Sequence, residues 1–582
     1  MPVRWKRLLL CVVLGLLLAV AAVSSLTEPR SSAAAAEPSV FSNAVVAADH
    51  PLASRAGAEI LESGGNVVDA AVATSFALSV VRPASCGIGG GGFMVIWNAQ
   101  KRQAIALDYR ERAPAEAHRR MYVDSTDPRT SRSALSRRGH LAVAVPGTVA
   151  GLCYALEHYG TLDLKTVLQP AIRLARNGVQ PDRHDRIVQG LVLRRFKEHP
   201  EYRQEFRTLF ELYLNAGVPW GPNQLFKSPQ LTVLEKIATE GKDGFYIGPV
   251  GEALLAEFKR GRGLITKEDL ATMQPVVREP LRGRFSDFDI LTMPPPSSGG
   301  VALLETFNTL TAYREQHLQS GSQKQSTSDS LHVLVEALKH AFADRAEFLG
   351  DADFANVPVD RLISVAYARQ IAKTIDNQKT QAQDVYGRFQ PVEDAGTSHF
   401  SVIDSQGNAV ACTETINTTF GSFVVEPTYG IVLNNEMDDF AAVPGQPNAY
   451  GLIQSEANAV EGRKKPLSSM TPTIVVQDGK AVYAVGGSGG PMIISSTLQV
   501  LLNLFARMSP AEAVAQPRIH HQWIPNTLFA EPDILKRARA LESRGHAVQQ
   551  RSGIAATQAV SRQADGLRGG SDPRKGGRPA GY

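Results

Sequence analysis

The chain contains 582 residues, of which 43% are hydrophobic and 20% are charged, and its formal net charge is +4. This composition is ordinary for a soluble globular protein, and the length allows one large domain or several smaller ones. Most of the net positive charge lies in residues 1–36, so the remainder of the chain is nearly neutral. The charge balance therefore gives no indication of binding to nucleic acid or to an anionic membrane surface.

Residues 1–36 have the pattern of a secretory signal peptide. Basic residues at positions 4, 6 and 7 precede an apolar run over 8–23, and small residues suited to cleavage follow at 31–36. The apolar run is shorter than the roughly 20 residues that a membrane-spanning helix needs. We therefore expect residues 1–36 to be removed and no stable membrane anchor to remain. The expected location is the periplasm, with the extracellular medium as the alternative.

Three cysteines remain after removal of this segment, namely Cys86, Cys153 and Cys412. An odd number of cysteines in an exported protein argues against a disulfide framework, so we expect buried thiols. None of the three has the paired spacing of a zinc site. The cysteines therefore predict neither a disulfide framework nor a bound metal.

Apolar residues recur at the three-to-four spacing of amphipathic helices in the first two thirds of the chain and again near its end. A Gly64-Gly65 pair predicts a break within the first of these segments. The expected helical segments are 53–81, 151–177, 329–348 and 495–508.

From Thr397 onward the pattern changes to short strand-like runs with turns between them. The Asp478-Gly479 pair between two of these runs is a good signal for a tight hairpin. The final segment, 561–582, is rich in glycine and arginine, and we expect it to be loosely held. The expected strands are 398–403, 409–413, 473–476 and 481–485.

The junction between Gly396 and Thr397 has the form of a self-cleavage site. A small residue precedes a threonine, and a strand-like run follows it. A threonine at a new N-terminus carries both nucleophile and base, because its hydroxyl attacks while its own α-amine accepts the proton. Taken alone, the same residues could form an ordinary loop that enters a strand.

A glycine-rich turn over 485–491 joins a predicted strand to a predicted helix. Pro491 lacks an N–H group, so donors directed at an anion must come from Gly489 and Gly490. Two backbone N–H groups at the start of a helix can form an oxyanion hole. A plain turn at the entry of a helix is the alternative interpretation.

The segment 413–421 carries hydroxyl and amide side chains at alternating positions. If this segment is a strand, Thr415 and Asn417 lie on one face of it, because side chains alternate across a strand. An edge strand that is merely rich in threonine is the alternative interpretation.

Two further polar segments can recognise a charged substrate. The loop 434–440 contains three carboxylates and no neighbouring histidine, so it suits a substrate ammonium group better than a metal, although a solvated acidic loop is the alternative. Ser468 and Ser469 lie in a proline-bounded turn whose hydroxyl and N–H groups can hold a carboxylate. Arg110 can bind a carboxylate through two hydrogen bonds, with a surface ion pair as the alternative.

In this order, these segments resemble the γ-glutamyltransferase (γ-glutamyltranspeptidase) family of N-terminal-nucleophile hydrolases. The likeness extends from about Asn43 to Tyr582, and it implies an α+β fold, a four-layer αββα sandwich. The strings that carry it are DYRE at 108–111, GTSHFSV at 396–402, NTTFGS at 417–422, NNEMDDF at 434–440, KPLSSMTPT at 465–473 and HHQW at 520–523.

The resemblance implies catalytic roles for four residues. Thr397 matches the nucleophile, and Thr415 matches the threonine that hydrogen-bonds it and assists maturation. Gly489 and Gly490 match the oxyanion hole. The family usually has Gly-Ser-Pro-Gly-Gly at this turn, whereas this chain has Gly-Gly-Ser-Gly-Gly at 486–490, so we expect the turn to be looser and catalysis to be less efficient.

The resemblance also implies a substrate-binding set. Its members either hold the charged groups at the substrate's α-carbon or cover the site. Arg110, Ser468 and Ser469 match the groups that hold the α-carboxylate, Asn417, Glu436 and Asp439 match those around the α-amino group, and Tyr450 matches a lid residue.

The implied protein is a precursor that cleaves itself between Gly396 and Thr397. The large subunit is then 37–396 and the small subunit 397–582, and the two form a heterodimer within one intertwined fold. The implied substrates are glutathione and other γ-glutamyl compounds, and the acceptors are water, amino acids or peptides. No cofactor, metal or nucleic acid is expected.

Two alternatives to this function remain. A glutaryl-β-lactam (cephalosporin) acylase of the same superfamily uses the same nucleophile chemistry but has no need to bind an α-ammonium group. A homologue that cannot process itself could instead act as an exported binding protein. The presence of Asp439 and of the Tyr450 lid residue argues against the acylase.

Overall fold

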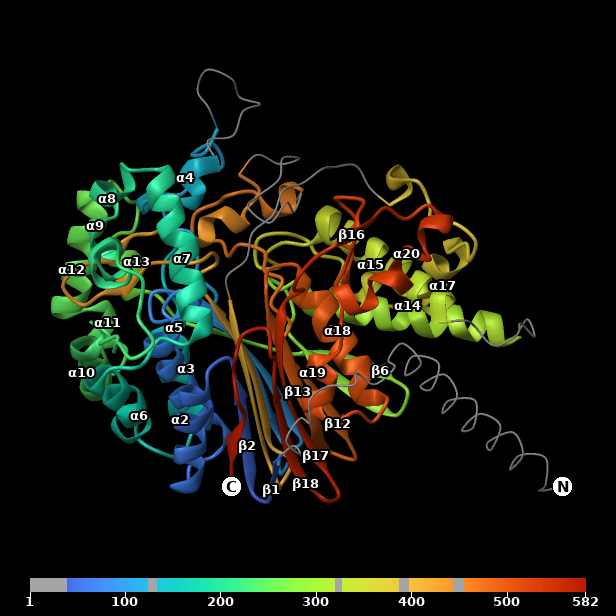
Figure 1. Ribbon diagram of the computed structural model, residues 1–582, viewed down its shortest axis with the longest axis horizontal. Helices are drawn as coiled ribbons and strands as arrows, with labels where there is room; N and C mark the ends of the chain where they lie inside the picture. The colour runs from blue at the N-terminus through green and yellow to red at the C-terminus, as the bar shows by residue number, and fades with distance from the viewer. Residues whose placement is uncertain (1–38, 124–132, 320–326, 387–396, 443–454) are drawn as a thin grey trace.

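The computed structural model describes residues 39–123, 133–319, 327–386, 397–442 and 455–582. This part of the chain forms two stacked β-sheets between two layers of helices (Figure 1). The predicted α+β fold with four αββα layers is therefore confirmed. The predicted signal segment, 1–36, and Tyr450 lie outside the described residues.

One sheet contains the strand that follows Thr397. That strand lies in the interior of the sheet and pairs antiparallel with its neighbours on both sides. In spatial order, the described strands of this sheet are β19 (Ala580–Gly581), β2 (Ala44–Ala48), β8 (Ser398–Asp404), β9 (Ala409–Thr415), β3 (Gly91–Asn98), β4 (Gln103–Asp108) and β5 (Val276–Arg278).

The second sheet contains the strand that leads to the glycine-rich turn. Its predicted hairpin is present, with positive φ angles of 53° at Asp478 and 77° at Gly479, as a tight two-residue turn requires. In spatial order, its described strands are β1 (Val40–Phe41), β18 (Gly566–Ser571), β17 (Ala556–Gln563), β13 (Lys480–Ser488), β12 (Thr473–Gln477), β7 (Phe288–Thr292) and β6 (Leu281–Phe285).

Apolar side chains between the sheets form one core, and those on their outer faces form two others. On β3, Phe93 and Val95 pack against the second sheet, whereas Met94 and Ile96 pack against helices. This alternation follows from the two-residue period of a strand. Because both faces are covered, β8 and β9 are almost continuously buried.

Helices cover the outer face of each sheet (Figure 1). Beside the first sheet lie α2 (Pro51–Glu62), α3 (Val67–Val81), α5 (Thr148–Tyr159) and α6 (Leu164–Asn177), and beside the second lie α14 (Gly299–Gln319), α15 (Thr327–Phe348) and α18 (Met492–Phe505). Other described helices of ten or more residues are α7 (Arg183–Glu198), α10 (Leu231–Glu240), α12 (Gly248–Arg260) and α17 (Val365–Thr374).

The predicted helix 53–81 is interrupted where the glycine pair indicated. Gly64 has a φ of 90°, and Asn66 then starts α3 with a capping box that includes Asp69. The predicted helix 151–177 is instead two helices, because Asp163 caps the N-terminus of α6 after a turn at Gly160. The spacing of apolar residues alone gives no sign of this second break.

The expectation that 561–582 is loosely held is wrong. β18 pairs with β17 along its whole length, and β19 pairs with β2 at the edge of the first sheet. Asp572, which follows β18, is buried and forms an ion pair with Arg518 at 2.7 Å. The glycines of this segment serve close packing: a Cβ atom at Gly570 would lie 2.3 Å from the backbone of Pro510.

The three described cysteines are free thiols, as predicted. Cys86 and Cys412 are buried, and Cys153 is partly buried. Among the helices of the described residues, none is both long enough and apolar enough to cross a bilayer.

A buried carboxyl group beneath the first sheet should make stability depend on pH. Glu414 on β9 accepts hydrogen bonds from Ser75 at 2.6 Å and from Tyr109 at 2.9 Å. Burial nevertheless raises the pKa of the Glu414 carboxyl from 4.5 to about 7. The folded state therefore holds this proton more tightly than the unfolded chain, so the stabilisation is present below pH 4.5 and is lost as the pH rises to 7.

We expect Glu414→Gln to remove this pH dependence. Relative to the variant, the wild-type protein should lose about 3 kcal/mol of unfolding free energy between pH 4.5 and 7, since one pKa unit corresponds to about 1.4 kcal/mol. Urea unfolding of both proteins at pH 4.5 and pH 7 measures the difference. Parallel pH profiles for the two proteins would show that Glu414 does not titrate in this range.

Candidate active site

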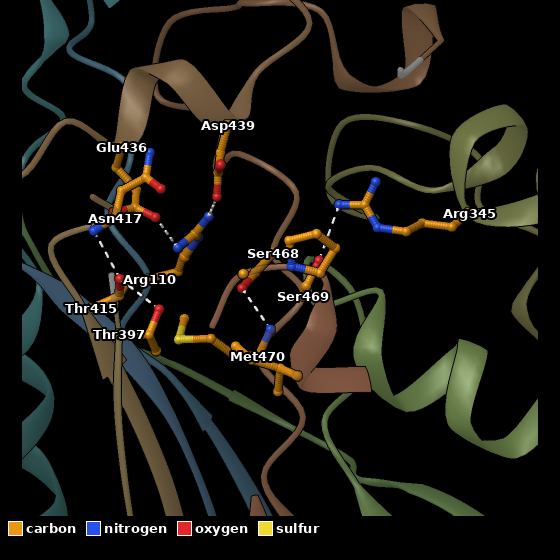
Figure 2. Close-up of a pocket in the computed structure, with 13 residues that line it drawn as sticks. Arg110, Arg345, Thr397, Thr415, Asn417, Glu436, Asp439, Ser468, Ser469 and Met470 are labelled. Atoms are coloured by element: carbon orange, nitrogen blue, oxygen red, sulfur yellow. Dashed lines mark hydrogen bonds and ion pairs between the residues drawn. The ribbon is translucent and has the colours of Figure 1, made fainter. Parts of the chain in front are cut away.

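Thr397 lies in a pocket whose lining comes from the end of β9, from α15 and α18, and from the loops around them (Figure 2). Thr397 immediately precedes β8 and is only 5% exposed. The pocket is lined by Arg110, Arg345, Thr397, Thr415, Asn417, Glu436, Asp439, Ser468, Ser469, Met470, Gly490, Pro491 and Ile493. Nearly all of the predicted site residues thus lie together, although they come from distant parts of the sequence.

The predicted nucleophile and its predicted partner are neighbours. The hydroxyl oxygens of Thr397 and Thr415 are 3.3 Å apart, and the Thr415 hydroxyl accepts a hydrogen bond of 2.8 Å from the backbone N–H of Asn417 (Figure 2). With that acceptor position occupied, the Thr415 hydroxyl proton can be directed at the Thr397 oxygen. The contact fits a role for Thr415 in orienting the nucleophile.

Asn417 lies at the pocket, but its backbone conformation differs from the predicted one. β9 ends at Thr415, and Asn417 has a φ of 70°, so the two residues do not alternate along one strand. The Asn417 side chain donates a hydrogen bond of 2.9 Å to the backbone carbonyl of Asn435. β9 is also an interior strand, so the alternative of a threonine-rich edge strand is excluded.

Arg110 is buried between two carboxyl groups of the acidic loop. Its guanidinium donates to Glu436 and, at 2.6 Å, to Asp439, while its Nε atom donates to the carbonyl of Pro466 at 3.1 Å (Figure 2). Both carboxyl residues lie in the 3₁₀ turn Glu436–Asp439. The alternative interpretations, a surface ion pair and a solvated acidic loop, are therefore excluded.

The electrostatic balance around Arg110 depends mainly on burial. Burial raises the pKa of the Glu436 and Asp439 carboxyl groups, and the Arg110 guanidinium opposes this shift. All three arms of Arg110 have protein acceptors, so its positive charge is largely compensated within the protein. Carboxyl oxygens thus line this side of the pocket, and they can accept hydrogen bonds from a cationic group of a ligand.

Ser468 and Ser469 form a second polar surface of the pocket (Figure 2). The Ser468 hydroxyl accepts a hydrogen bond of 3.1 Å from the backbone N–H of Met470. The Ser469 hydroxyl accepts one of 3.4 Å from the guanidinium of Arg345. Because both hydroxyl oxygens accept, both O–H groups can donate to an anion.

The glycine-rich turn also has the predicted position. Gly490 lines the pocket, Gly489 precedes it, and α18 begins directly after Pro491. Gly489 has a φ of 135°, and a Cβ atom there would lie 2.9 Å from the Cα atom of Ala555. Glycine is therefore needed at 489, and the start of a helix favours a developing negative charge.

The departure from the usual family string covers two positions, with Gly487 in place of serine and Ser488 in place of proline. Ser488 is the last residue of β13 and pairs with Ala556 of β17. Its hydroxyl also lies 3.3 Å from the ammonium group of Lys575. The turn is thus held by strand pairing, which offsets the absence of the proline.

Sequence reasoning missed two charged residues at the site, Arg345 and Lys575. The Lys575 ammonium donates to the backbone carbonyl of Thr397 and forms an ion pair of 2.6 Å with Asp49. These contacts fix the backbone of the predicted nucleophile. None of the motifs in the sequence points to either residue.

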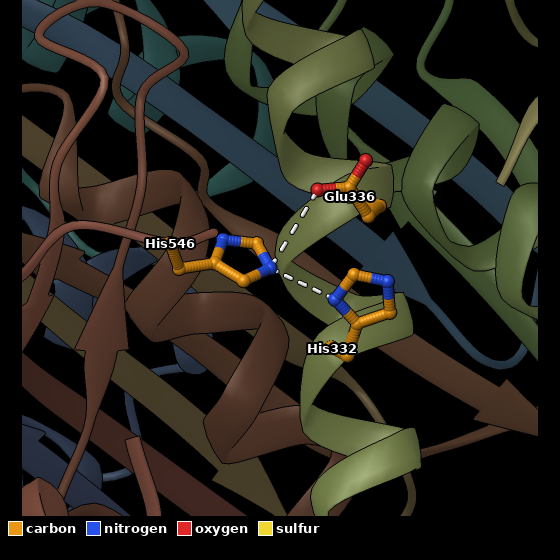
Figure 3. A group of neighbouring side chains, drawn as sticks. All are labelled: His332, Glu336 and His546. Atoms are coloured by element: carbon orange, nitrogen blue, oxygen red, sulfur yellow. Dashed lines mark hydrogen bonds and ion pairs between the residues drawn. The ribbon is translucent and has the colours of Figure 1, made fainter. Parts of the chain in front are cut away.

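A buried cluster formed by His332 and Glu336 of α15 and by His546 has ligand atoms close enough for a metal (Figure 3). The Nδ1 atom of His332 lies 2.8 Å from the Nε2 atom of His546, and Glu336 lies 3.8 Å from the same nitrogen. However, the Glu336 carboxylate already has two partners. The Lys339 ammonium lies 3.3 Å from it, and the Tyr386 hydroxyl donates a hydrogen bond to it. A cation would have to displace Lys339, so we assign no metal site here, and the expectation that no metal is used stays a prediction.

Comparison with known proteins gives one consistent family. The family profile described as Gamma-glutamyltranspeptidase matches residues 53–582. The glutathione hydrolase proenzyme of Escherichia coli (strain K12) is 42% identical over 540 residues, which cover 91% of this chain and 90% of that protein. The Acylase ACY 1 proenzyme of Pseudomonas sp. (strain SE83) is 37% identical over 520 residues, which cover 88% of each chain.

Comparison with solved structures agrees with this family. The crystal structure of cephalosporin acylase from Bacillus halodurans has a TM-score of 0.80 and 26% sequence identity, and the match covers 96% of this chain and 99% of that one. The predicted fold of the N-terminal-nucleophile hydrolases is thereby confirmed. The family profile spans almost the whole described chain, and the similarity to the Escherichia coli protein is extensive. The chain belongs to the γ-glutamyltranspeptidase family.

Proposed function

We propose that this protein is a self-cleaving γ-glutamyltransferase and glutathione hydrolase. The observation that carries the proposal is the position of Thr397, whose hydroxyl lies 3.3 Å from Thr415 at the edge of a pocket with separate acidic and hydroxyl-rich sides. Relatives at about 40% identity are named glutathione hydrolase proenzymes, which supports both the activity and the precursor form.

Maturation begins with attack of the Thr397 hydroxyl on the carbonyl of Gly396. The peptide nitrogen of Thr397 leaves as an amine, and an ester links Gly396 to the Thr397 side chain. Water then hydrolyses this ester, which frees the hydroxyl, the α-amine of Thr397 and the carboxylate of Gly396. The products, 37–396 and 397–582, remain a heterodimer, because strands from both sides of the junction share both sheets.

Catalysis then uses the same residue on a γ-glutamyl amide. The α-amine of Thr397 takes the hydroxyl proton as the oxygen attacks the γ-carbonyl carbon. N–H groups of Gly489 and Gly490 stabilise the tetrahedral oxyanion. The proton passes to the leaving amine, cysteinylglycine when the substrate is glutathione. Water, an amino acid or a peptide then attacks the γ-glutamyl ester, which restores the hydroxyl without any cofactor.

Substrate recognition follows from the charge distribution in the pocket. A γ-glutamyl group carries an ammonium and a carboxylate on the same α-carbon. Glu436 and Asp439 provide acceptors for the ammonium, and Asn417 closes that side of the pocket. Ser468 and Ser469 provide hydroxyl donors for the carboxylate. Arg110 holds the acidic loop in place, and the N–H donors that remain on its guanidinium group can join the two serines in holding the carboxylate.

A glutaryl-β-lactam acylase is the second candidate, favoured by the similarity to solved and sequenced acylases. The test compares release of p-nitroaniline from γ-glutamyl-p-nitroanilide and from glutaryl-p-nitroanilide, with and without glycylglycine as acceptor. We expect faster turnover of the γ-glutamyl compound and stimulation by glycylglycine. A preference for the glutaryl compound would instead assign the protein to the acylases, and an uncleaved, inactive chain would indicate an exported binding protein.

The proposed location is the periplasm or the extracellular medium, since residues 1–36 have the pattern of a signal peptide. Cell fractionation, with N-terminal sequencing of the large subunit, tests this location. An N-terminus at Met1 in the mature protein would contradict removal of the signal.

A further inference from the structure

Arg345 is a buried, charged residue at the pocket, and the sequence alone assigned it no role. It lies on α15, is 1% exposed, and reaches the pocket beside Ser469 (Figure 2). In the same view, Arg110 lies on the other side of the serine pair. Burial of a guanidinium group without hydrogen-bond or ion-pair partners destabilises the folded state. The groups that Arg345 contacts therefore indicate its role.

Arg345 donates hydrogen bonds to two neutral hydroxyl groups. Its Nε atom donates to Ser298 at 2.9 Å, and its terminal nitrogen donates to Ser469 at 3.4 Å. Arg110, in contrast, forms close ion pairs with both Glu436 and Asp439. Burial lowers the pKa of Arg345 to about 10, so the group is still charged at neutral pH. Asp439 also acts on Arg345 electrostatically, but only Arg110 has close ion pairs with the acidic loop, so Arg345 carries the less compensated charge of the two.

The contacts of Arg345 also orient the serine pair. The Ser469 oxygen accepts from the guanidinium, so its own proton can be directed at a ligand. Ser298 accepts from Arg345 and donates to the backbone carbonyl of Ser468, and the backbone N–H of Ser298 donates to the same carbonyl at 2.8 Å. Arg345 is therefore connected to the hydroxyl of one serine and, through Ser298, to the backbone of the other.

We propose that Arg345 is a positioning residue that completes the subsite for the substrate α-carboxylate. It holds the Ser469 hydroxyl with its proton directed at the carboxylate, and it supplies positive charge beside the serine pair. The inference rests on the proposed γ-glutamyl function and deepens it. The pocket then has a cationic side for the carboxylate and an acidic side for the ammonium, which fixes the orientation of the γ-carbonyl toward Thr397.

Two substrates separate this role from a structural one. γ-Glutamyl-p-nitroanilide carries both the α-carboxylate and the ammonium, whereas 4-aminobutyryl-p-nitroanilide carries only the ammonium. For Arg345→Met we expect KM for the γ-glutamyl compound to rise about ten- to a hundred-fold with kcat changed less than about threefold, because the lost contact binds substrate and transition state equally. For the 4-aminobutyryl compound, the loss of kcat/KM should be at least about fivefold smaller.

Two further variants complete the test. Arg345→Lys keeps the charge but loses the planar fork, so it should recover part of the lost affinity. Arg369→Met removes an exposed arginine that is paired with Glu315 at 3.7 Å, and it should behave as wild type. Rates are expressed per mature Thr397 N-terminus, which removes differences in maturation. If Arg345→Met does not mature, the comparison of substrates is made with Arg345→Lys.

Equal losses on both substrates would overturn the role of Arg345, as would failure of both Arg345 variants to mature, which would make the residue structural. A wild-type enzyme that does not cleave γ-glutamyl-p-nitroanilide would instead overturn the proposed function. The two failures are therefore distinguishable in one experiment.

Discussion

Thr397→Ala is expected to give a folded, uncleaved chain without activity. In the proposed mechanism the Thr397 hydroxyl is the attacking group in maturation, and the mature enzyme also needs the α-amine that maturation creates. The wild-type protein should show a fragment of about 20 kDa, by its share of the 62.8-kDa chain, with threonine at its N-terminus. The variant should lack this fragment, and its activity should fall by roughly a thousand-fold or more.

The fold itself should tolerate this change. Thr397 lies just before β8 and contributes one side chain to the pocket, while β8 is held by pairing with β2 and β9. Far-UV circular dichroism should therefore match the wild type. Thr397→Ser keeps a hydroxyl and should mature slowly with some activity, and Thr419→Ala, on a partly exposed residue away from the pocket, should mature normally. Turnover by Thr397→Ala well above about a thousandth of the wild-type rate would place the nucleophile elsewhere.

Asp439→Asn is expected to impair γ-glutamyl substrates selectively. Asp439 lines the pocket and lies 2.6 Å from Arg110, where it can also accept from a substrate ammonium. A charge-assisted hydrogen bond contributes about 1.5–3 kcal/mol, and an unpaired ammonium costs at least as much. The kcat/KM for γ-glutamyl-p-nitroanilide should therefore fall by roughly ten- to several-hundred-fold, whereas that for glutaryl-p-nitroanilide should change little.

The neighbouring residue provides a matched control. Asp438 is buried in the same turn, but its carboxylate accepts from Ser136 rather than lining the pocket. Asp438→Asn makes the same chemical change one residue away and should lower activity on both substrates by a similar, smaller factor. If Asp439→Asn also reduced both substrates equally, Asp439 would support the turn and Arg110 rather than bind an ammonium group.

How much of the site could be predicted depends on how local its chemistry is. The junction at Thr397, the glycine-rich turn at 489–490 and the serine pair at 468–469 are each contained in a short string. The hairpin at Asp478 could be predicted for the same reason, because its turn chemistry involves adjacent residues. Asn417 lies in the pocket as expected, but through a turn with positive φ that alternation along a strand could not indicate.

The sequence by itself determined the family and predicted the nucleophile and the acidic loop, because these are carried by adjacent residues in recognisable strings. Only the tertiary structure decided which charges meet. Three hydrogen-bonded pairs are far apart in the sequence. Arg110 and Asp439 are separated by 329 residues, Arg345 and Ser469 by 124, and Lys575 and Thr397 by 178. Such contacts arise when the two sheets stack and bring their loops together at one end. Periodicity and turn signals describe only neighbours along the chain, so they carry no information about these pairs.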